Sequence, residues 1–317
     1  MKRIICVLGL LLLLVGCSPK NNQEPIRIGV NDWPPCEVWY IAEEQGYFGD
    51  QPVEIVRFTT WTDNMSSLYL GKIDITHSTY FNTVNFFNKG ERGQMIAPID
   101  FIEGSDGFVV KENLDQFKES SMKVAVEVGT DEHFLMFKTF DALNIAVEDV
   151  EIVSSTSRKA MELFINGEVN GAFTYEPFLS KATQEGKGEI VYTTADMPGY
   201  MVDVLVAVEG DVTEQQEAYE TVMKAWYKAL DYIKENPDEA YEQMAQNENM
   251  DVEAFKPFFE SFHFFDLDQA HQLTDSTATL DYMDEMRTFI IDNKLGEDTE
   301  SIDKMIRIDV LEALKKE

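Results

Sequence analysis

The pattern of apolar and polar positions along the chain predicts strands that alternate with helices. Residues 26–30 have the pattern of a short buried strand, a helix then ends at Gly46, and residues 53–58 return to a strand pattern. This alternation continues to residue 110 and starts again at residue 122. Strands separated by helices are typical of sheets with crossover connections, so the pattern predicts an α/β fold.

The two rounds of this pattern predict two lobes. After an apolar strand at residues 204–208, the chain continues as helices with no further strand pattern. Such helices must pack on the sheets that the earlier strands form. We therefore predict a first lobe of residues 26–112 plus 206–317 and a second lobe of residues 113–205, each with a mostly parallel sheet flanked by helices.

The first residues form a separate segment. Lys2 and Arg3 precede an apolar run, and Leu14-Val15-Gly16-Cys17 follows it. This is the order of a signal peptide, with a charged region, an apolar region and a cleavage site, and the run is too short to span a bilayer as a mature helix. The order predicts a signal peptide at residues 1–16 and an exported mature chain.

The Leu-x-Gly-Cys pattern resembles the bacterial lipoprotein signal. That resemblance implies that Cys17 is acylated, becomes the new amino terminus and anchors the protein in the cell envelope, facing the periplasm or the exterior. An ordinary secretory signal that is cut near the same place is the alternative. Residues 17–25 are polar with two prolines, which predicts an anchor followed by a flexible tether.

Charge and cysteine content narrow the function classes. The formal net charge of −32 disfavours nucleic acid and acidic lipid surfaces as partners. Once Cys6 leaves with the signal peptide and Cys17 is lipidated, Cys36 has no disulfide partner. A nucleophilic role for Cys36 would need a base, and no histidine lies near it in the sequence, so a partly buried apolar cysteine is the favoured interpretation.

Known chemical motifs are missing from the sequence. The four histidines have no cysteine or histidine partner at ligand spacing, and we find no nucleophile elbow, P-loop or dinucleotide fingerprint. We therefore expect neither a metal nor a cofactor.

Loops that follow the predicted strands carry the candidate binding residues. The carboxyl ends of strands in open α/β sheets meet at one edge, where ligands bind. Aromatic rings there can clamp a small ligand or hold a cation on their faces, although packing between the lobes is the alternative. In the first part of the chain the predicted binding residues are Asp32, Trp33, Trp39, Trp61, Thr62 and Tyr80.

A second group of candidates follows in the later loops. Gly129 and Thr130 open a helix whose free amides could seat an anion, or they simply cap it. His133 could reach the ligand or face solvent, Glu176 could bind a donor or favour its own helix end, and Asp203 lies near the expected hinge or in a surface turn. The predicted binding residues of this group are Ser105, Gly129, Thr130, His133, Tyr175, Glu176 and Asp203.

Short motifs in a fixed order then suggest a family. They are Ile26–Gly29, Ala42–Phe48, Leu70–Asp74, Val128–Asp131, Asn166–Ala172 and Tyr175–Pro177. The combination resembles the solute-binding proteins of ABC importers, and more closely the branch that includes nitrate, aliphatic sulfonate, taurine and thiamine-precursor binders. It departs where Asn170-Gly171 replaces the usual Asp-Ala of the second lobe.

The resemblance implies a periplasmic-binding-protein fold of type II that closes on a small-molecule solute. It further implies delivery of the solute to ABC permease subunits in the membrane and no chemistry, and we expect a monomer. An enzyme of thiamine-pyrimidine or menaquinone-precursor type with the same fold is the alternative, but it would need a cytosolic location, against which Cys17 argues. A sensory or adhesion role would need a fused signalling domain or repeats.

The charges in the candidate loops bear on the solute. Acidic residues dominate them, and Arg158 is the only guanidinium in a loop-to-helix position. A bare anion such as nitrate would need more donors. We therefore expect a sulfonate or taurine-like solute or a related nitrogen-containing one, with an amine or heteroaromatic ring, whose anionic end, where it has one, sits at Gly129 and Thr130.

Overall fold

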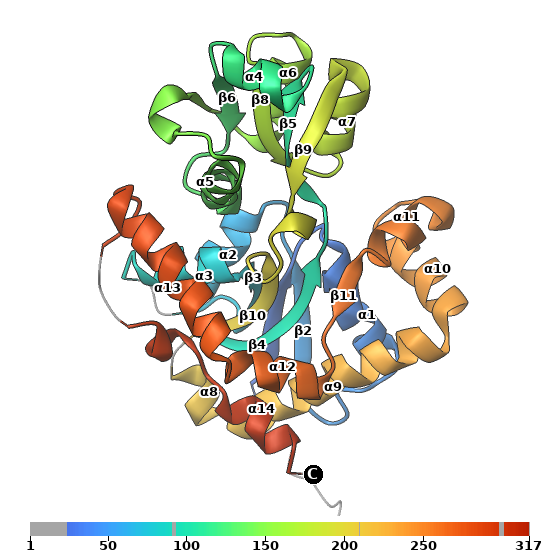
Figure 1. Cartoon of the computed structure of the whole chain (residues 1–317). Coiled ribbons are helices and arrows are strands. Elements are labelled where there is room, and N and C mark those ends of the chain that lie inside the picture. Colours follow the sequence, from blue (N-terminus) through green and yellow to red (C-terminus); the bar gives the residue numbers. More distant parts are fainter. Residues whose placement is uncertain (1–23, 91–92, 209, 298–300, 317) are drawn as a thin grey trace, which may run out of the picture.

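The chain folds into two lobes that are joined by two crossings (Figure 1). The computed structural model describes residues 24–90, 93–208, 210–297 and 301–316. The predicted signal peptide, Cys17 and most of the predicted tether lie outside these residues. Within the described part, no helix combines the length and apolarity that crossing a membrane requires.

The larger lobe is built on a six-stranded sheet with the order β11-β4-β10-β3-β1-β2. Strand β1 runs parallel to β2 and β3, whereas β10 runs antiparallel to β3 and β4. Residues of β1 are almost all buried, as expected for a strand covered on both faces. The strands are β1 (Ile26–Val30), β2 (Val53–Arg57), β3 (Ile75–Thr79), β4 (Gly93–Ile102), β10 (Val202–Val208) and β11 (Phe262–Phe264).

Helices from both ends of the chain cover this sheet (Figure 1). The rings of Trp39 and Trp226 pack at 4.7 Å, and both side chains are fully buried, which places a core between the first and ninth helices. The helices are α1 (Glu37–Glu44), α2 (Trp61–Tyr69), α3 (Tyr80–Phe87), α8 (Asp211–Glu214), α9 (Gln216–Glu235), α10 (Pro237–Asn247), α11 (Val252–Phe259), α12 (Leu267–Thr274), α13 (Thr277–Asp292) and α14 (Asp309–Leu314), with 3-10 turns at Pro34–Cys36 and Ile302–Met305.

The smaller lobe has a five-stranded sheet with the order β7-β6-β8-β5-β9. Strand β6 runs parallel to β7 and β8, and β5 runs antiparallel to β8 and β9. The elements are β5 (Asp106–Lys111), α4 (Leu114–Glu119), β6 (Lys123–Val126), α5 (Asp131–Leu143), β7 (Glu151–Ser154), α6 (Ser157–Ile165), β8 (Gly171–Tyr175), α7 (Phe178–Gly186) and β9 (Gly188–Thr193), with 3-10 turns at Val147–Asp149 and Thr194–Asp196.

The two-lobed α/β prediction is confirmed, but two of its details need correction. Strand β5 pairs in the second sheet and β10 pairs in the first, so the crossings fall at residues 103–105 and 194–201, and the predicted boundaries at 112/113 and 205/206 are wrong. The core of β5 is uniformly apolar and buried, a pattern that does not reveal which sheet the strand joins. Each sheet also combines parallel and antiparallel pairs, and β11 adds a strand among the carboxyl-terminal helices.

The lobes touch along one side, where α5 meets α3 and α13. The ring of Phe134 stacks on Phe81 at 5.8 Å and meets Phe289 at 5.4 Å. In the same region the Lys138 ammonium contacts the Glu285 carboxylate at 3.0 Å. This side of the space between the lobes is therefore closed by packed side chains.

Candidate functional site: a cleft between the lobes

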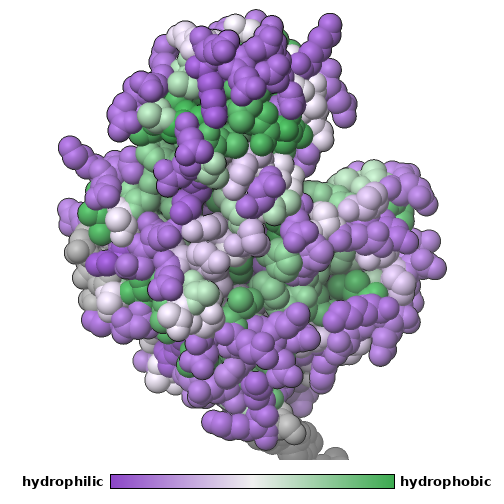
Figure 2. Space-filling model, in the orientation of Figure 1, coloured by the Kyte–Doolittle hydropathy of each residue, from purple (hydrophilic) through white to green (hydrophobic). Residues whose placement is uncertain are grey.

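A cavity of about 450 Å³ lies between the lobes, at the carboxyl ends of β1 and β3 and beside both crossings. In the space-filling view the molecule narrows between the smaller lobe and the region of α10 and α11 (Figure 2). The volume is that of a small-molecule site. We call this cavity the cleft.

Eight of the predicted binding residues line the cleft. They come from distant parts of the chain, and the fold brings them together at one place, as the strand-end argument anticipates. They are Asp32, Trp33, Trp61, Ser105, Thr130, Tyr175, Glu176 and Asp203. Their positions make them candidates for solute contact.

Three of the other predicted residues lie in the larger lobe without lining the cleft. Trp39 is fully buried, and its Nε1 donates to His77 Nε2 at 2.8 Å, so it belongs to the core. Tyr80 is 1% exposed in α3. Thr62 is exposed in the first turn of α2. In each case the helical turn directs the side chain away from the strand end that precedes it.

The remaining two predicted residues, Gly129 and His133, lie at the contact between the lobes. The Gly129 carbonyl accepts a hydrogen bond from Asn85 Nδ2 at 3.2 Å. The His133 ring packs edge-on against Phe289 at 5.1 Å, and burial lowers its pKa to about 4. Neither residue lines the cleft.

The cleft also contains residues that we did not predict to bind. Some of them are sequence neighbours of predicted residues at strand ends. Their position in the sequence could therefore have indicated that they line the cleft. Phe258, from α11, is different, because nothing in its helical pattern indicates that α11 reaches the cleft. The residues in this group are Asn31, His77, Ser78, Thr79, Asn82, Asp106, Glu127, Asp131, Glu132, Pro177, Phe178, Met201 and Phe258.

Acidic side chains dominate the polar lining, and no lysine or arginine is among the described residues that line the cleft. Two of the acids serve neighbouring helix ends, because Glu176 accepts from the Ser180 amide at 3.1 Å and Glu127 accepts from the Ser157 amide at 2.9 Å. We call the whole set the cleft carboxylates: Asp32, Asp106, Glu127, Asp131, Glu132, Glu176 and Asp203.

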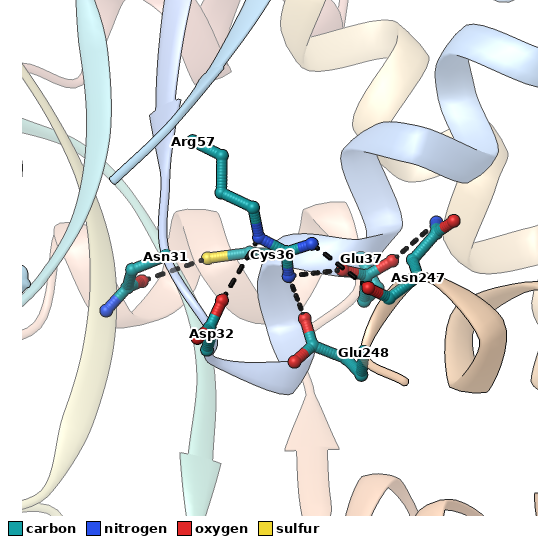
Figure 3. Close-up of polar contacts among 7 residues, drawn as sticks. All are labelled: Asn31, Asp32, Cys36, Glu37, Arg57, Asn247 and Glu248. Carbon is teal, nitrogen blue, oxygen red and sulfur yellow. Dashed lines mark hydrogen bonds and ion pairs between the residues drawn. The ribbon is translucent and has the colours of Figure 1, made fainter. Parts of the chain in front are cut away.

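The guanidinium of Arg57 lies beside the cleft but is surrounded by acids (Figure 3). It contacts Asp32 at 3.1 Å, Glu37 at 3.2 Å and Glu248, and it donates to the Asn247 carbonyl at 3.2 Å. Glu37 is fully buried and also accepts from Asn247 Nδ2 at 2.8 Å. Because three acidic side chains and a backbone carbonyl surround this one cation, Arg57 has little capacity left for an anionic solute.

Burial raises the pKa of four cleft carboxylates. It raises the pKa of Asp106 and of Asp203 to about 7, that of Asp131 to about 6 and that of Glu132 to about 8, where the neighbouring Asp131 adds to the effect. Hydrogen bonds from neutral donors oppose these shifts, such as the Trp33 Nε1 bond of 2.8 Å to Asp203. Within the part of the chain that the structure describes, the hydrogen bonds to these four acids come from neutral groups, and no ion pair to them is found.

Asp100 lies directly behind Asp203. The two residues are opposite each other on the antiparallel pair β4 and β10, so their side chains share a face of the sheet. Asp100 is fully buried, neither of its carboxylate oxygens has a hydrogen-bond partner within the described structure, and burial together with Asp203 raises its pKa. An acid that is buried without hydrogen-bond partners costs stability.

The amino terminus of α5, which we expected to seat an anion, is satisfied from within the chain. The carboxylates of Asp131 and Glu132 each accept a hydrogen bond from the backbone of their own residue. The Thr130 hydroxyl donates to the Glu127 carbonyl at 2.7 Å. An anion arriving here would meet two carboxylates before it met the amides. The acids of the first turn therefore satisfy this terminus, whereas Thr130, the expected cap, makes no side-chain capping bond.

Asp131 also ties the two lobes together across the cleft. Its carboxylate accepts from Thr79 Oγ1 at 2.6 Å and from Asn82 Nδ2 at 2.7 Å, both of which belong to the larger lobe. The three side chains form a polar bridge at the floor of the cleft. If the lobes move apart at this point, both hydrogen bonds to Asp131 have to break.

Cys36 has no nucleophilic character in this setting. Its side chain is fully buried, its Sγ donates to Asn31 Oδ1 at 3.5 Å, and burial raises the pKa of the thiol. Across the described residues, no group of three or more histidine, cysteine or acidic side chains has the arrangement of a metal site.

This two-lobed architecture is that of the periplasmic-binding-protein fold. A Candida albicans protein described as having the generic periplasmic binding protein structural fold matches with a TM-score of 0.64 at 14% identity, over 93% of this chain and 95% of that chain. The periplasmic aliphatic sulphonate binding protein SsuA of Escherichia coli matches with a TM-score of 0.73 at 14% identity, over 90% of this chain and 92% of that chain.

Sequence comparison gives the family. The model of the NMT1-like family matches residues 19–247, and the chain belongs to this family. A putative aliphatic sulfonates-binding protein of Bacillus subtilis (strain 168) is 24% identical over 273 residues, which are 79% of each chain.

Proposed function

We propose that the chain is the extracytoplasmic solute-binding component of an ABC importer. It captures a small solute in the cleft, the lobes close on it, and the loaded protein delivers it to the permease subunits without changing it chemically. The observation that carries this proposal is the cleft itself, which is lined from both lobes and lies beside both crossings. Membership of the NMT1-like family and the likeness to sulfonate-binding proteins support it.

The solute is a sulfonate or taurine-like compound or a related nitrogen-containing compound. Names of the relatives favour the first class, and the acidic lining of the cleft favours an amine. The enzyme alternative has weaker support. Ser105 donates to Asp106 in the cleft, but Cys36 is buried, and His77 of the cleft lining accepts a hydrogen bond from Trp39 instead of contacting a hydroxyl.

The test is a thermal-shift screen of the mature protein with small sulfonates, amines, nitrate and pyrimidines. Binding to the native state raises the melting temperature in proportion to occupancy. We expect at least one compound to stabilise the protein and to be recovered unchanged after long incubation. Conversion of the compound into a product would contradict the proposal and point to catalysis.

We further propose that Cys17 carries a lipid that holds the monomeric protein at the cell envelope next to its permease. The amino-terminal sequence supports this anchor. In the natural host, the wild-type protein should sediment with membranes, and a Cys17→Ala variant should not become lipidated. Equal membrane association and equal mass of the two mature proteins would contradict the anchor.

A further inference from the structure

We infer that the cleft selects a positively charged organic solute, an amine or quaternary ammonium compound that carries no anionic group. Its cationic nitrogen sits among Asp106, Asp131 and Asp203. This inference rests on the proposed function and narrows its solute class. It differs from what the names of the sulfonate-binding relatives suggest.

Charge balance is the first argument. Asp203 is subject to the charges of Asp131 and Asp106, and Asp106 to those of Asp131 and Glu176, so these acids lie close enough to repel one another. No lysine or arginine from the described residues lines the cleft to offset them. A cation entering the cleft relieves this repulsion, whereas a sulfonate increases it.

The two arginines nearest the cleft do not reverse this balance. Arg57 contacts three acidic side chains, one of which is Asp32 in the lining of the cleft. Arg158 is exposed, and its guanidinium lies 5.0 Å from the ring centroid of Phe178. Neither residue is among those that line the cleft.

The second, independent argument is Asp100. This carboxylate is fully buried, faces Asp203 on the same side of the sheet and has no donor for either oxygen in the described structure. Two adjacent buried acids, of which Asp203 lines the cleft, need a proton or a cation between or beside them. A cationic group bound at Asp203 supplies positive charge to both.

Aromatic rings complete the site for a cation. Trp33 and Trp61 line the cleft from the larger lobe, and Tyr175 lines it from the smaller lobe. The Trp33 indole is fixed by edge contacts with Phe258 at 6.1 Å and Phe262 at 5.1 Å and by its bond to Asp203. Aromatic faces bind alkylammonium groups through the negative potential of the ring, and they offer an anion no such attraction.

The experiment titrates the mature protein with four probes of similar size. Putrescine and choline are the cations, ethanesulfonate is the anion and taurine is the zwitterion. We expect at least one cation to bind about a hundredfold more tightly than ethanesulfonate and taurine, with an affinity that falls as salt is added. Tight binding of ethanesulfonate or taurine with no cation bound would overturn the inference and leave the proposed function standing.

Matched variants test the same point within the chain. Asp203→Asn keeps the shape of the side chain but removes its charge, and it should weaken cation binding by about tenfold or more. Asp141→Asn makes the same charge change at an exposed position of α5 and should leave affinity unchanged. Arg158→Gln should leave cation binding unchanged or tighten it, since it removes a positive charge near Tyr175.

The outcomes separate the two proposals. Equal affinity of the wild-type protein and Asp203→Asn for the cation would overturn the inference, provided that circular dichroism shows both proteins folded. A cation that binds but is consumed during incubation would support the inference and contradict the importer function. Binding of no cation in the series, by a folded protein, would overturn the inference as well.

Discussion

The indole Nε1 of Trp33 donates a hydrogen bond of 2.8 Å to Asp203 Oδ2, across 170 positions of sequence. Trp33 follows β1, and Asp203 lies at the start of β10, just after the second crossing between the lobes. The bond therefore connects a loop that lines the cleft with the strand that follows the second crossing between the lobes. A change in either residue is expected to affect both the solute and the motion of the lobes.

Replacing Trp33 with phenylalanine tests this connection. Trp33→Phe keeps an aromatic ring in the cleft but removes the donor to Asp203, so a solute bound there should lose affinity by about tenfold. Tyr219→Phe is the matched control, because it also keeps an aromatic ring and removes a buried donor, here the 3.2 Å bond to the Asp74 carbonyl, and neither residue lines the cleft. It should lower the melting temperature with little change in affinity. Calorimetric titration of both variants checks this, and an unchanged affinity of Trp33→Phe would remove the ring and its bond from the account.

The bridge from Asp131 to the larger lobe should hold the free protein partly closed. Asn82→Ala removes the 2.7 Å bond while leaving the Thr79 bond in place. We expect a loss of about 1–2 kcal/mol in the free energy of unfolding, because a buried carboxylate loses a donor. We also expect a larger radius of gyration without solute, measured by small-angle scattering. Asn64→Ala, which removes the acceptor of a 2.8 Å bond from the Thr76 hydroxyl within the larger lobe, is the comparison and should leave the radius unchanged. An unchanged radius for Asn82→Ala would argue against the bridge as a restraint.

Glu37 should make the protein less stable as the pH rises. Burial, followed by the neighbouring Glu248, raises the pKa of Glu37 to about 8 and outweighs the opposite effect of Arg57. The folded state therefore binds a proton that the unfolded chain releases above its ordinary pKa of 4.5, so stability is lost between about pH 4.5 and pH 8. Glu37→Gln resembles the protonated acid. In this variant the free energy of unfolding should fall by about 2 kcal/mol less over this pH range than it does in the wild-type protein.

Urea unfolding at pH 5 and pH 8.5 measures this effect. Glu148→Gln, at an exposed position, serves as the control and should follow the wild-type protein at both pH values. A pH dependence of Glu37→Gln identical to that of the wild-type protein would show that Glu37 stays ionised in its pairing with Arg57.

Gly29 should not tolerate a side chain. A Cβ atom there would lie 2.2 Å from Asn64 Oδ1 and 2.3 Å from Ile73 Cδ1, inside a packed region between β1 and α2. Gly29→Ala should therefore cost about 2–4 kcal/mol in the free energy of unfolding. Gly71→Ala has open space but a φ of +64°, and it should cost only about 1 kcal/mol. Equal losses in denaturant unfolding would contradict this packing around β1.

Local signals in the sequence predicted much of the fold. Alternating apolar runs located β1, β2 and β3, and Gly46 marked the turn after the first helix, because these features depend on neighbouring residues. The pairing of β5 and β10 depends on contacts between distant parts of the chain. Both strands are buried and apolar, and only their partners decide the lobe to which each belongs.

The site shows the same division. Asp32, Trp33 and Asp203 follow or begin strands and were predicted from that position. Phe258 reaches the cleft only because α11 packs beside the loop after β1, a tertiary contact that no local pattern encodes. The expected anion seat at Thr130 was a sound general inference, but the acids of the first helical turn occupy it.

The most direct test of the account counts protons during solute binding. The ionisable groups around the solute are the cleft carboxylates, Asp100 behind them, His77 and Tyr175, with Arg158 near Tyr175. Burial raises the pKa of Asp106 and of Asp203 to about 7, that of Asp131 to about 6 and that of Glu132 to about 8, so these four acids can exchange protons near pH 7. A bound cation lowers the pKa of the carboxylates and drives protons off, whereas a bound anion draws protons in. Calorimetric titrations at pH 7 in two buffers of different ionisation enthalpy give the number. We predict net proton release with putrescine or choline, and net uptake with the tightest-binding solute would contradict the account.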